Sequence, residues 1–166
     1  VERANEMLWD GNAKYVGCYG SCYATARYWG GWQDDAWEDL ILKLRQRDPS
    51  IVPVIIGASW DTDIATKLMR RLESKSVPYV KVIGENLCLV IELMKRFPYG
   101  FYFPSGLACI AGTLNTPATM WYPKHLDTMR GKWCDPALTA SDTFHEIPFC
   151  SPDAMIKYID SRGGIK

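Results

Sequence analysis

The sequence has no apolar run long enough to cross a bilayer and no excess of charge of either sign. Its longest apolar stretch, residues 52–58, is interrupted by Pro53 and Gly57, whereas a transmembrane helix needs about 20 consecutive apolar residues. Its 19 basic side chains are balanced by 19 acidic ones, and proteins that bind nucleic acids usually carry a basic excess. We therefore expect neither a transmembrane segment nor a nucleic-acid partner.

Closely spaced metal ligands are also missing. The chain has only two histidines, His125 and His145, and its six cysteines form no C-x-x-C pair. Zinc sites need tighter ligand spacing, and cysteines within apolar segments behave as small hydrophobic residues. The pattern predicts no metal site, no cofactor, no disulfide and a reducing, cytoplasmic location.

The chain begins with VERANE, which contains neither an initiator Met nor the apolar core of a signal peptide. We interpret this start as a cut end, produced by processing or by excision of a domain from a longer protein. The 166 residues match the usual size of one domain. We expect a single domain over residues 1–166, in which residues 1–13 form an N-terminal extension and residues 137–166 form an irregular segment that ends in a helix.

What the sequence does contain is a regular alternation of strand and helix patterns. A 3.6-residue apolar period begins at Asp34 and stops at Asp48, which predicts an amphipathic helix. The apolar, β-branched run at residues 52–57 predicts a strand that is covered on both faces. On the same grounds, strands are predicted at residues 14–20, 52–57, 79–83, 100–103 and 117–122, and helices at residues 34–47, 63–74, 87–97, 105–114 and 153–160.

Strands that alternate with helices in this way are typical of a parallel sheet with right-handed crossover connections. The predicted fold class is α/β: a Rossmann-like three-layer α/β/α sandwich with a mainly parallel sheet of five to six strands. In such sheets, ligands bind beyond the carboxyl ends of the strands, where the order of the strands reverses. Functional residues are therefore expected in the segments that follow the predicted strands.

The strongest candidate is the junction at Ser105 and Gly106, where a strand leads directly into a helix. Ser105 is a favourable N-cap residue, and Gly106 would let backbone N–H groups approach a ligand closely. A helix N-terminus attracts anions through these N–H groups and through its dipole. Taken alone, the two residues more often form a plain helix cap, but their position at the carboxyl edge of the sheet favours an anion site.

Three further residues are weaker candidates. Asp61 follows the second predicted strand and could accept hydrogen bonds from ribose hydroxyls; a charge at a helix N-terminus explains it equally well. Arg27 could bind a diphosphate with two guanidinium nitrogens, although a lone arginine in a loop is more often a solvated charge. His125 follows the fifth predicted strand and could act as an acid or base. Neither a dinucleotide-binding nor a P-loop fingerprint occurs.

Four stretches of the sequence, taken in order, resemble the motifs of a known enzyme family. Residues 32–40 (WQDDAWEDL) resemble W-P-x-x-x-W-x-x-L, and residues 56–65 (IGASWDTDIA) resemble G-G-x-x-E-x-x-x-A. Residues 86–93 (NLCLVIEL) correspond to N-L-x-G-x-x-x-L, and residues 104–117 (PSGLACIAGTLNTP) to D-S-G-x-x-H-x-A followed by L-G-T-P. Over residues 14–136 the chain thus resembles the C-terminal half of a GT-B glycosyltransferase, in particular of family 9, the ADP-heptose:lipopolysaccharide heptosyltransferases.

Two positions depart from these motifs. Pro104 stands where the family has an Asp, and Cys109 stands where it has a His. Both family residues are ligands of the sugar nucleotide, so the departures affect the expected donor geometry and the expected specificity for heptose.

The resemblance also implies roles for individual residues. The residues that would hold the diphosphate are Ser105, Gly106 and Leu107, assisted by Thr25 and Arg27. Asp61 would bind the ribose, and Gly84 would lie near the base. GT-B catalysis needs no bound metal, because a helix dipole and basic side chains stabilise the departing diphosphate.

The expected function is therefore that of a glycosyltransferase donor-binding domain. It would bind a nucleotide-diphosphate sugar, such as an ADP- or UDP-sugar, for transfer of the glycosyl group to a saccharide acceptor such as the lipopolysaccharide core. The chain has room for the donor half only, so activity would need a further N-terminal domain. Two alternatives remain: a fragment of a GT-B-fold nucleotide-sugar epimerase, in which His125 would matter more, and a noncatalytic Rossmann-like binding module, which Pro104 and Cys109 favour.

Overall fold

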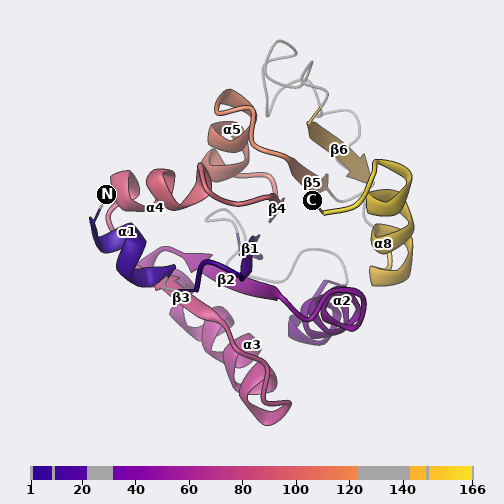
Figure 1. Ribbon diagram of the computed structural model, residues 1–166, viewed down its shortest axis with the longest axis horizontal. Helices are drawn as coiled ribbons and strands as arrows, with labels where there is room; N and C mark the ends of the chain where they lie inside the picture. Colours follow the sequence, from indigo (N-terminus) through magenta and orange to yellow (C-terminus); the bar gives the residue numbers. More distant parts are fainter. Residues whose placement is uncertain (1, 9, 22–31, 123–142, 149, 166) are drawn as a thin grey trace.

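A six-stranded sheet in which every neighbouring pair is parallel forms the centre of the computed structural model (Figure 1). The structure describes residues 2–8, 10–21, 32–122, 143–148 and 150–165. The strands lie in the order β3-β2-β1-β4-β5-β6. Their bounds are β1 Lys14–Tyr19, β2 Ile51–Gly57, β3 Val80–Ile83, β4 Tyr99–Tyr102, β5 Ala118–Tyr122 and β6 Phe144–Pro148. The predicted α/β, Rossmann-like class is confirmed.

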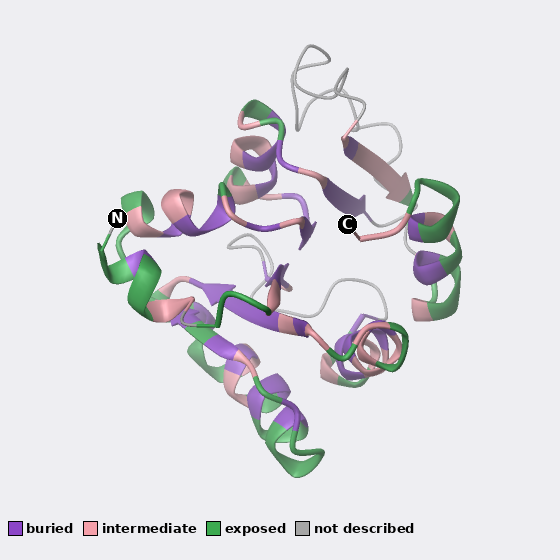
Figure 2. Ribbon diagram, viewed as in Figure 1, coloured by how far each residue is buried: buried purple, intermediate pink, exposed green. Residues whose placement is uncertain are grey.

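Helices cover both faces of this sheet, so its strands are largely buried (Figure 2). One face packs against α2 Asp34–Arg47, α3 Thr62–Ser74 and α8 Pro152–Ser161. The other packs against α1 Glu2–Met7, α4 Leu87–Met94 and α5 Gly106–Thr113. This arrangement explains why the strands are continuous apolar runs instead of alternating sequences.

Aromatic rings fill the core between α2 and the strands β4 and β5. Trp121 of β5 lies at the centre of this cluster, with ring centroids 4.8 Å from Trp32, 5.0 Å from Trp37 and 5.0 Å from Phe103. Several of the tryptophans therefore serve packing and are not available to a ligand.

The structure adds two elements that the sequence did not predict, and the expectation of an irregular segment within residues 137–166 is wrong in detail. Within residues 137–166, Phe144–Pro148 is not irregular: it forms strand β6, which pairs in parallel with β5. Within residues 1–13, Glu2–Met7 forms helix α1, whose Ala4 is buried in the core that α4 and α5 share. Both elements carry too few apolar residues to show a clear strand or helix period.

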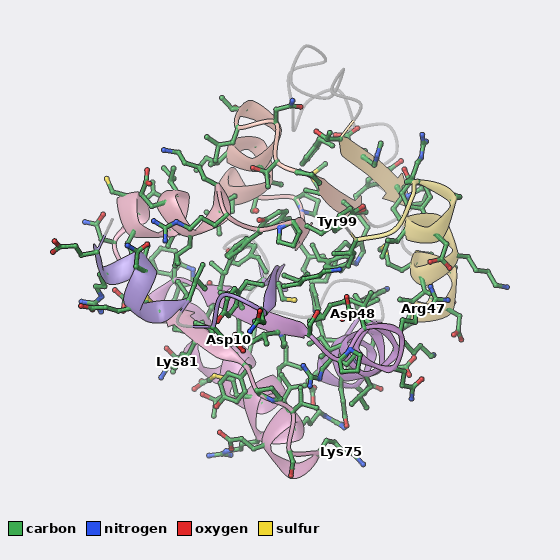
Figure 3. The ribbon with its side chains drawn as sticks, in the orientation of Figure 1. Asp10, Arg47, Asp48, Lys75, Lys81 and Tyr99 are labelled. Carbon is green, nitrogen blue, oxygen red and sulfur yellow. The ribbon has the colours of Figure 1, made fainter. Side chains whose placement is uncertain are left out.

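Short polar contacts fix the ends of the elements. The carboxylate of Asp48, between α2 and β2 (Figure 3), accepts hydrogen bonds from the Ser50 hydroxyl at 2.5 Å and from the Ser50 backbone N–H at 3.0 Å, and pairs with the Lys14 ammonium at 2.9 Å. These contacts join the end of α2 to the starts of β1 and β2. In the part of the chain that the structure describes, no helix has the length and apolar character needed to span a membrane.

Candidate functional site

A pocket of about 580 Å³ lies at the carboxyl edge of the sheet, where the strand order reverses between β1 and β4. From β1 the chain proceeds outward to β2 and β3, and it then returns to the other side of β1 with β4. Open α/β sheets bind ligands at such switch points, and the volume is within the usual range for small-molecule sites. The described residues that line it are Tyr19, Ile56, Gly57, Ala58, Trp60, Glu85, Leu87, Val90, Pro104, Ser105, Gly106, Leu107 and Ile110.

The start of α5 forms one end of this pocket. Ser105 is its N-cap, and its Oγ accepts a hydrogen bond from the Ala108 N–H at 3.3 Å. Helix geometry leaves the N–H groups of Gly106 and Leu107 without intrahelical acceptors. A Cβ atom added to Gly106 would meet no atom within 4 Å. The packing of the fold therefore does not require glycine at this position. Close approach of an anion to the backbone would require it.

The opposite end of the pocket lies beyond β2 and β3. Trp60 belongs to the short 3-10 turn η1 Ser59–Asp61, and Leu87 is the first residue of α4. Trp60 is 63% exposed and Leu87 54% exposed, and they are the only large hydrophobic side chains so exposed among the described residues. Both line this pocket. Exposed apolar side chains that line one pocket suit contact with an apolar part of a ligand.

Glu85 is the only charged side chain among the described residues that line the pocket. Its Oε1 accepts a hydrogen bond of 2.7 Å from the Arg3 guanidinium, which belongs to α1. Gly84, which precedes Glu85, has a φ of +70°, a backbone conformation that favours glycine. Its N–H donates to the Gly57 carbonyl at 2.9 Å, so a backbone hydrogen bond joins the segments that follow β2 and β3.

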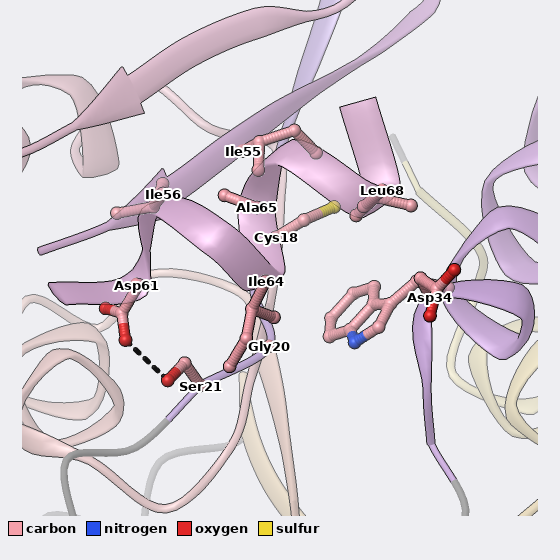
Figure 4. A pocket seen from close by; sticks show the side chains of 11 residues that line it. Cys18, Gly20, Ser21, Asp34, Ile55, Ile56, Asp61, Ile64, Ala65 and Leu68 are labelled. Atoms are coloured by element: carbon pink, nitrogen blue, oxygen red, sulfur yellow. Dashed lines mark hydrogen bonds between the residues drawn. The ribbon is translucent and has the colours of Figure 1, made fainter. Parts of the chain in front are cut away.

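Asp61 lies next to this pocket but lines a separate, small cavity of about 20 Å³ (Figure 4). The side chain is 3% exposed. Its Oδ1 accepts a hydrogen bond from the Ser21 hydroxyl at 2.6 Å, and its Oδ2 accepts one from the Ala58 N–H at 2.8 Å. The carboxylate thus braces the segments that follow β1 and β2, and its contact with a ribose stays a prediction.

Cys18 lines the same small cavity from β1. Burial raises the pKa of the Cys18 thiol far above its usual value, so the thiol stays protonated. Nucleophilic chemistry requires the thiolate, and Cys18 is therefore a packing residue.

The structure brings Ser105, Gly106 and Leu107 together at one end of the pocket, whereas Gly84 precedes the lining residue Glu85 and is not itself among the lining residues. Thr25, Arg27 and His125 lie outside the described residues. Trp60, Glu85 and Leu87 were missed as site residues: Trp60 stands at a variable position of one motif-like stretch, Leu87 was taken only as a helix residue of another, and Glu85 lies outside all four. Their position directly after two predicted strands was the one available signal. Among the described residues, no group of three or more His, Cys, Asp or Glu side chains has the geometry of a metal site.

Comparisons with known proteins agree on the fold. No protein-family model matches the sequence, and no curated protein matches it significantly. Solved structures do match. With E. coli ADP-heptose LPS heptosyltransferase II, the TM-score is 0.73 at 16% identity, and the match covers 97% of this chain and 50% of that chain.

Two further structures are similar over the same region. A family 9 glycosyl transferase from Veillonella parvula DSM 2008 gives a TM-score of 0.62 at 12% identity, covering 99% of this chain and 43% of that one. UDP-GlcNAc 2-epimerase from Neisseria meningitidis, bound to UDP-GlcNAc, gives a TM-score of 0.68 at 14% identity. That match covers 96% of this chain and 40% of the epimerase chain. The chain therefore has a GT-B-like, heptosyltransferase-like fold and spans about half the length of these proteins, as the sequence motifs predicted.

Proposed function

We propose that this chain is the half of a glycosyltransferase that binds a nucleotide-diphosphate sugar. The observation that carries the proposal is the 580 Å³ pocket at the strand-order reversal, with the N-terminus of α5 at one end and an exposed aromatic side chain at the other. A nucleoside diphosphate has matching ends: an anionic diphosphate and an apolar, planar base.

The start of α5 supplies what a departing diphosphate requires. When the glycosyl bond breaks, negative charge accumulates on the diphosphate oxygens. The N–H groups of Gly106 and Leu107 would donate hydrogen bonds to these oxygens, and the positive end of the helix dipole would stabilise the charge. The described lining residues include no cation. Thr25 and Arg27 remain part of the proposal as additional diphosphate ligands.

The acceptor side of the reaction is proposed on the fold alone. Because the chain spans about half of the similar structures, binding of a saccharide such as the lipopolysaccharide core would require residues from a second domain. ADP-heptose is the donor named for one similar structure and UDP-GlcNAc is bound to another, which supports an ADP- or UDP-sugar as ligand here. We also propose a cytoplasmic location, because the protein would need access to nucleotide sugars.

Titration calorimetry with ADP, UDP, GDP and their sugars tests the proposal. Wild-type protein should bind at least one of them, and Gly106→Asp should weaken that binding at least tenfold. The new carboxylate would face the diphosphate, yet an acidic residue in the first turn of α5 should stabilise the helix by about 0.3–1 kcal/mol. Gly106→Ala adds a side chain without a charge, so its loss of affinity measures crowding at the backbone, and the additional loss in Gly106→Asp measures the effect of the charge.

Two results would count against this function. If none of these nucleotides binds to the wild-type protein, the chain is a noncatalytic module of another kind. If Gly106→Asp binds as tightly as wild type, the diphosphate does not lie at α5. The similarity to an epimerase supports a second candidate, a nucleotide-sugar epimerase fragment, for which binding of UDP-GlcNAc in preference to every ADP-sugar is the expected result.

A further inference from the structure

The pocket proposed for an anionic ligand has an acidic side chain in its wall. Glu85 is the one charged residue among the described residues that line it, and a glutamate carboxylate is negatively charged at neutral pH. A nucleoside diphosphate is also an anion, so the two negative charges repel each other. An uncompensated Glu85 would therefore weaken the binding of such a ligand.

The cation that pairs with Glu85 comes from helix α1. The guanidinium of Arg3 donates a hydrogen bond of 2.7 Å to Oε1 of Glu85. The two side chains also line a second cavity, of about 290 Å³. Glu85 lines both cavities, whereas Arg3 lines only the smaller one. The ion pair therefore lies at the boundary between the two cavities, with its acidic member facing the proposed ligand.

Other contacts hold α1 where Arg3 can reach Glu85. Ala4, the next residue, is fully buried in the core that α4 and α5 share. The Asn5 side chain accepts a hydrogen bond of 2.5 Å from the guanidinium of Arg96, which lies just after α4. The side chain of Arg3 is 65% exposed and that of Glu85 24% exposed. An ion pair this exposed contributes little to stability, so the attachment of α1 does not depend on Arg3.

The charge of Glu85 would act on a ligand across the pocket. A cavity of about 580 Å³ is on the order of 10 Å across, which is about one Debye length in 0.1 M salt. The carboxylate and a diphosphate at the start of α5 would therefore be incompletely screened from each other. With Arg3 in place, the ion pair presents no net charge to the ligand.

Resting on the proposed function, we infer that Arg3 is a positioning residue of the nucleotide pocket. It acts through Glu85: it holds the carboxylate and neutralises its charge, and the pocket can then accept an anionic ligand. Arg3 itself contacts no part of the ligand. Residues 1–13 were expected to form an N-terminal extension, and on this account their helix α1 is a functional part of the site.

Titration calorimetry with ADP, UDP and GDP at two salt concentrations tests the role of the charge. In about 0.05 M salt, Arg3→Ala should weaken binding of the nucleotide that wild type prefers by about 3- to 10-fold. This difference should vanish in 1 M salt, where the Debye length is about 3 Å. Arg3→Lys keeps the cation and should bind within about twofold of wild type. Melting curves should be nearly unchanged.

The double variant Arg3→Ala/Glu85→Gln separates charge compensation from a structural role, because it removes both charges. Its affinity should return to within about twofold of wild type. Glu85→Gln alone should bind at least as tightly as wild type, since Arg3 is then a cation without its partner. Arg96→Ala is the matched control. It breaks another polar contact between α1 and α4 but leaves the Arg3–Glu85 pair intact, and it should not change the affinity.

The outcomes separate this inference from the proposed function. If wild type binds none of the three nucleotides, the proposed function fails together with the inference. If wild type binds one of them and Arg3→Ala binds it equally tightly in low salt, only the role of Arg3 is refuted. The same holds if the loss persists in 1 M salt or in the double variant. Equal weakening by Arg96→Ala would show that Arg3 only holds α1 in place.

Discussion

The hydroxyl of Ser21 donates a 2.6 Å hydrogen bond to the carboxylate of Asp61, 40 residues further along the chain. Both side chains are buried. The second carboxylate oxygen accepts from the Ala58 N–H at 2.8 Å. A single acidic side chain therefore connects the segment after β1 to the turn after β2, and its partner Ala58 lines the pocket proposed for the nucleotide.

We expect Asp61→Ala to lower the free energy of unfolding by about 3 kcal/mol, because two donors lose a charged acceptor in a buried place. For a chain of this size the melting temperature should fall by roughly 6–12 °C. A double-mutant cycle with Ser21→Ala should give a coupling of about 1.5–3 kcal/mol. Additive effects of the two substitutions would show that the hydrogen bond contributes nothing.

The same variant separates bracing from ribose binding. If Asp61 only joins the segments after β1 and β2, the Asp61→Ala protein should bind ADP nearly as tightly as wild type does. The comparison is made at a temperature at which the variant is folded. Loss of a ribose hydrogen bond would instead weaken binding about ten- to hundredfold. Calorimetry at low temperature, together with melting without ligand, distinguishes these results.

Two tyrosines of strand β4 should respond oppositely to loss of their hydroxyl. The Tyr102 hydroxyl is buried without a hydrogen-bond partner among the described residues, and burial raises its pKa. The Tyr99 hydroxyl shares a 2.6 Å hydrogen bond with the Thr119 hydroxyl, and burial raises the pKa of Tyr99 to about 12. One hydroxyl is thus desolvated without compensation, and the other is paired.

We therefore expect Tyr102→Phe to change stability by about 0 to +1 kcal/mol, since removing an unpaired buried hydroxyl relieves a desolvation cost. Tyr99→Phe should cost about 1–3 kcal/mol, because the Thr119 hydroxyl is left unsatisfied. Urea denaturation of both variants measures the difference. Equal destabilisation by the two substitutions would contradict this account.

Local sequence patterns predicted the elements whose side chains are buried on a regular period. The helix from Asp34 to Arg47 was predicted because its apolar stripe faces the sheet, and the strand at Ile51–Gly57 because both of its faces are covered. Strand β6 was missed because only its first residue, Phe144, is buried. An edge strand needs no continuous apolar run, and its pairing with β5 is a tertiary contact that no local pattern encodes.

The site was predictable to a similar degree. The helix start at Ser105 and Gly106 could be predicted because helix capping is a local property, and contact of these residues with a diphosphate stays a prediction. The positions of Trp60 and Glu85 in the pocket depend on the register between β2 and β3 and on which side chains remain exposed. Both follow from long-range packing, so the sequence alone could not distinguish Trp60 from the tryptophans of the core.

Stability should depend on the charge of Asp48 at acidic pH. The Ser50 hydroxyl, then the Lys14 ammonium and the Ser50 N–H, lower the pKa of Asp48 from 3.8 to about 2. A carboxyl whose pKa is lowered by folding stabilises the protein above its unfolded pKa and ceases to do so as pH falls through the folded pKa. The stabilisation should therefore be complete above pH 4 and lost between about pH 4 and pH 2.

Comparison of wild type with Asp48→Asn isolates this contribution. The stability difference should be constant between pH 5 and 7 and should disappear as the pH approaches 2. Added salt should reduce the part that depends on Lys14 and leave the part that depends on Ser50. A difference that is the same at pH 5 and pH 2 would contradict the pKa shift.

Finally, Cys18 should react with alkylating reagents only when the sheet opens. Its side chain is 3% exposed on β1, a strand that pairs on both sides, and burial raises the pKa of its thiol. Iodoacetamide needs both access and thiolate. Cys88, on α4, is exposed and provides the internal control.

Labelling of Cys18 in native buffer should be slower than that of Cys88 by at least on the order of 100-fold, since only the small unfolded fraction reacts. Mass spectrometry of the labelled peptides measures both rates. In denaturant the two rates should become similar and six thiols should be counted. Native-state labelling of Cys18 at the rate of Cys88 would mean that β1 is not a buried strand paired on both sides. The position of the pocket at the carboxyl end of β1 would then be contradicted as well.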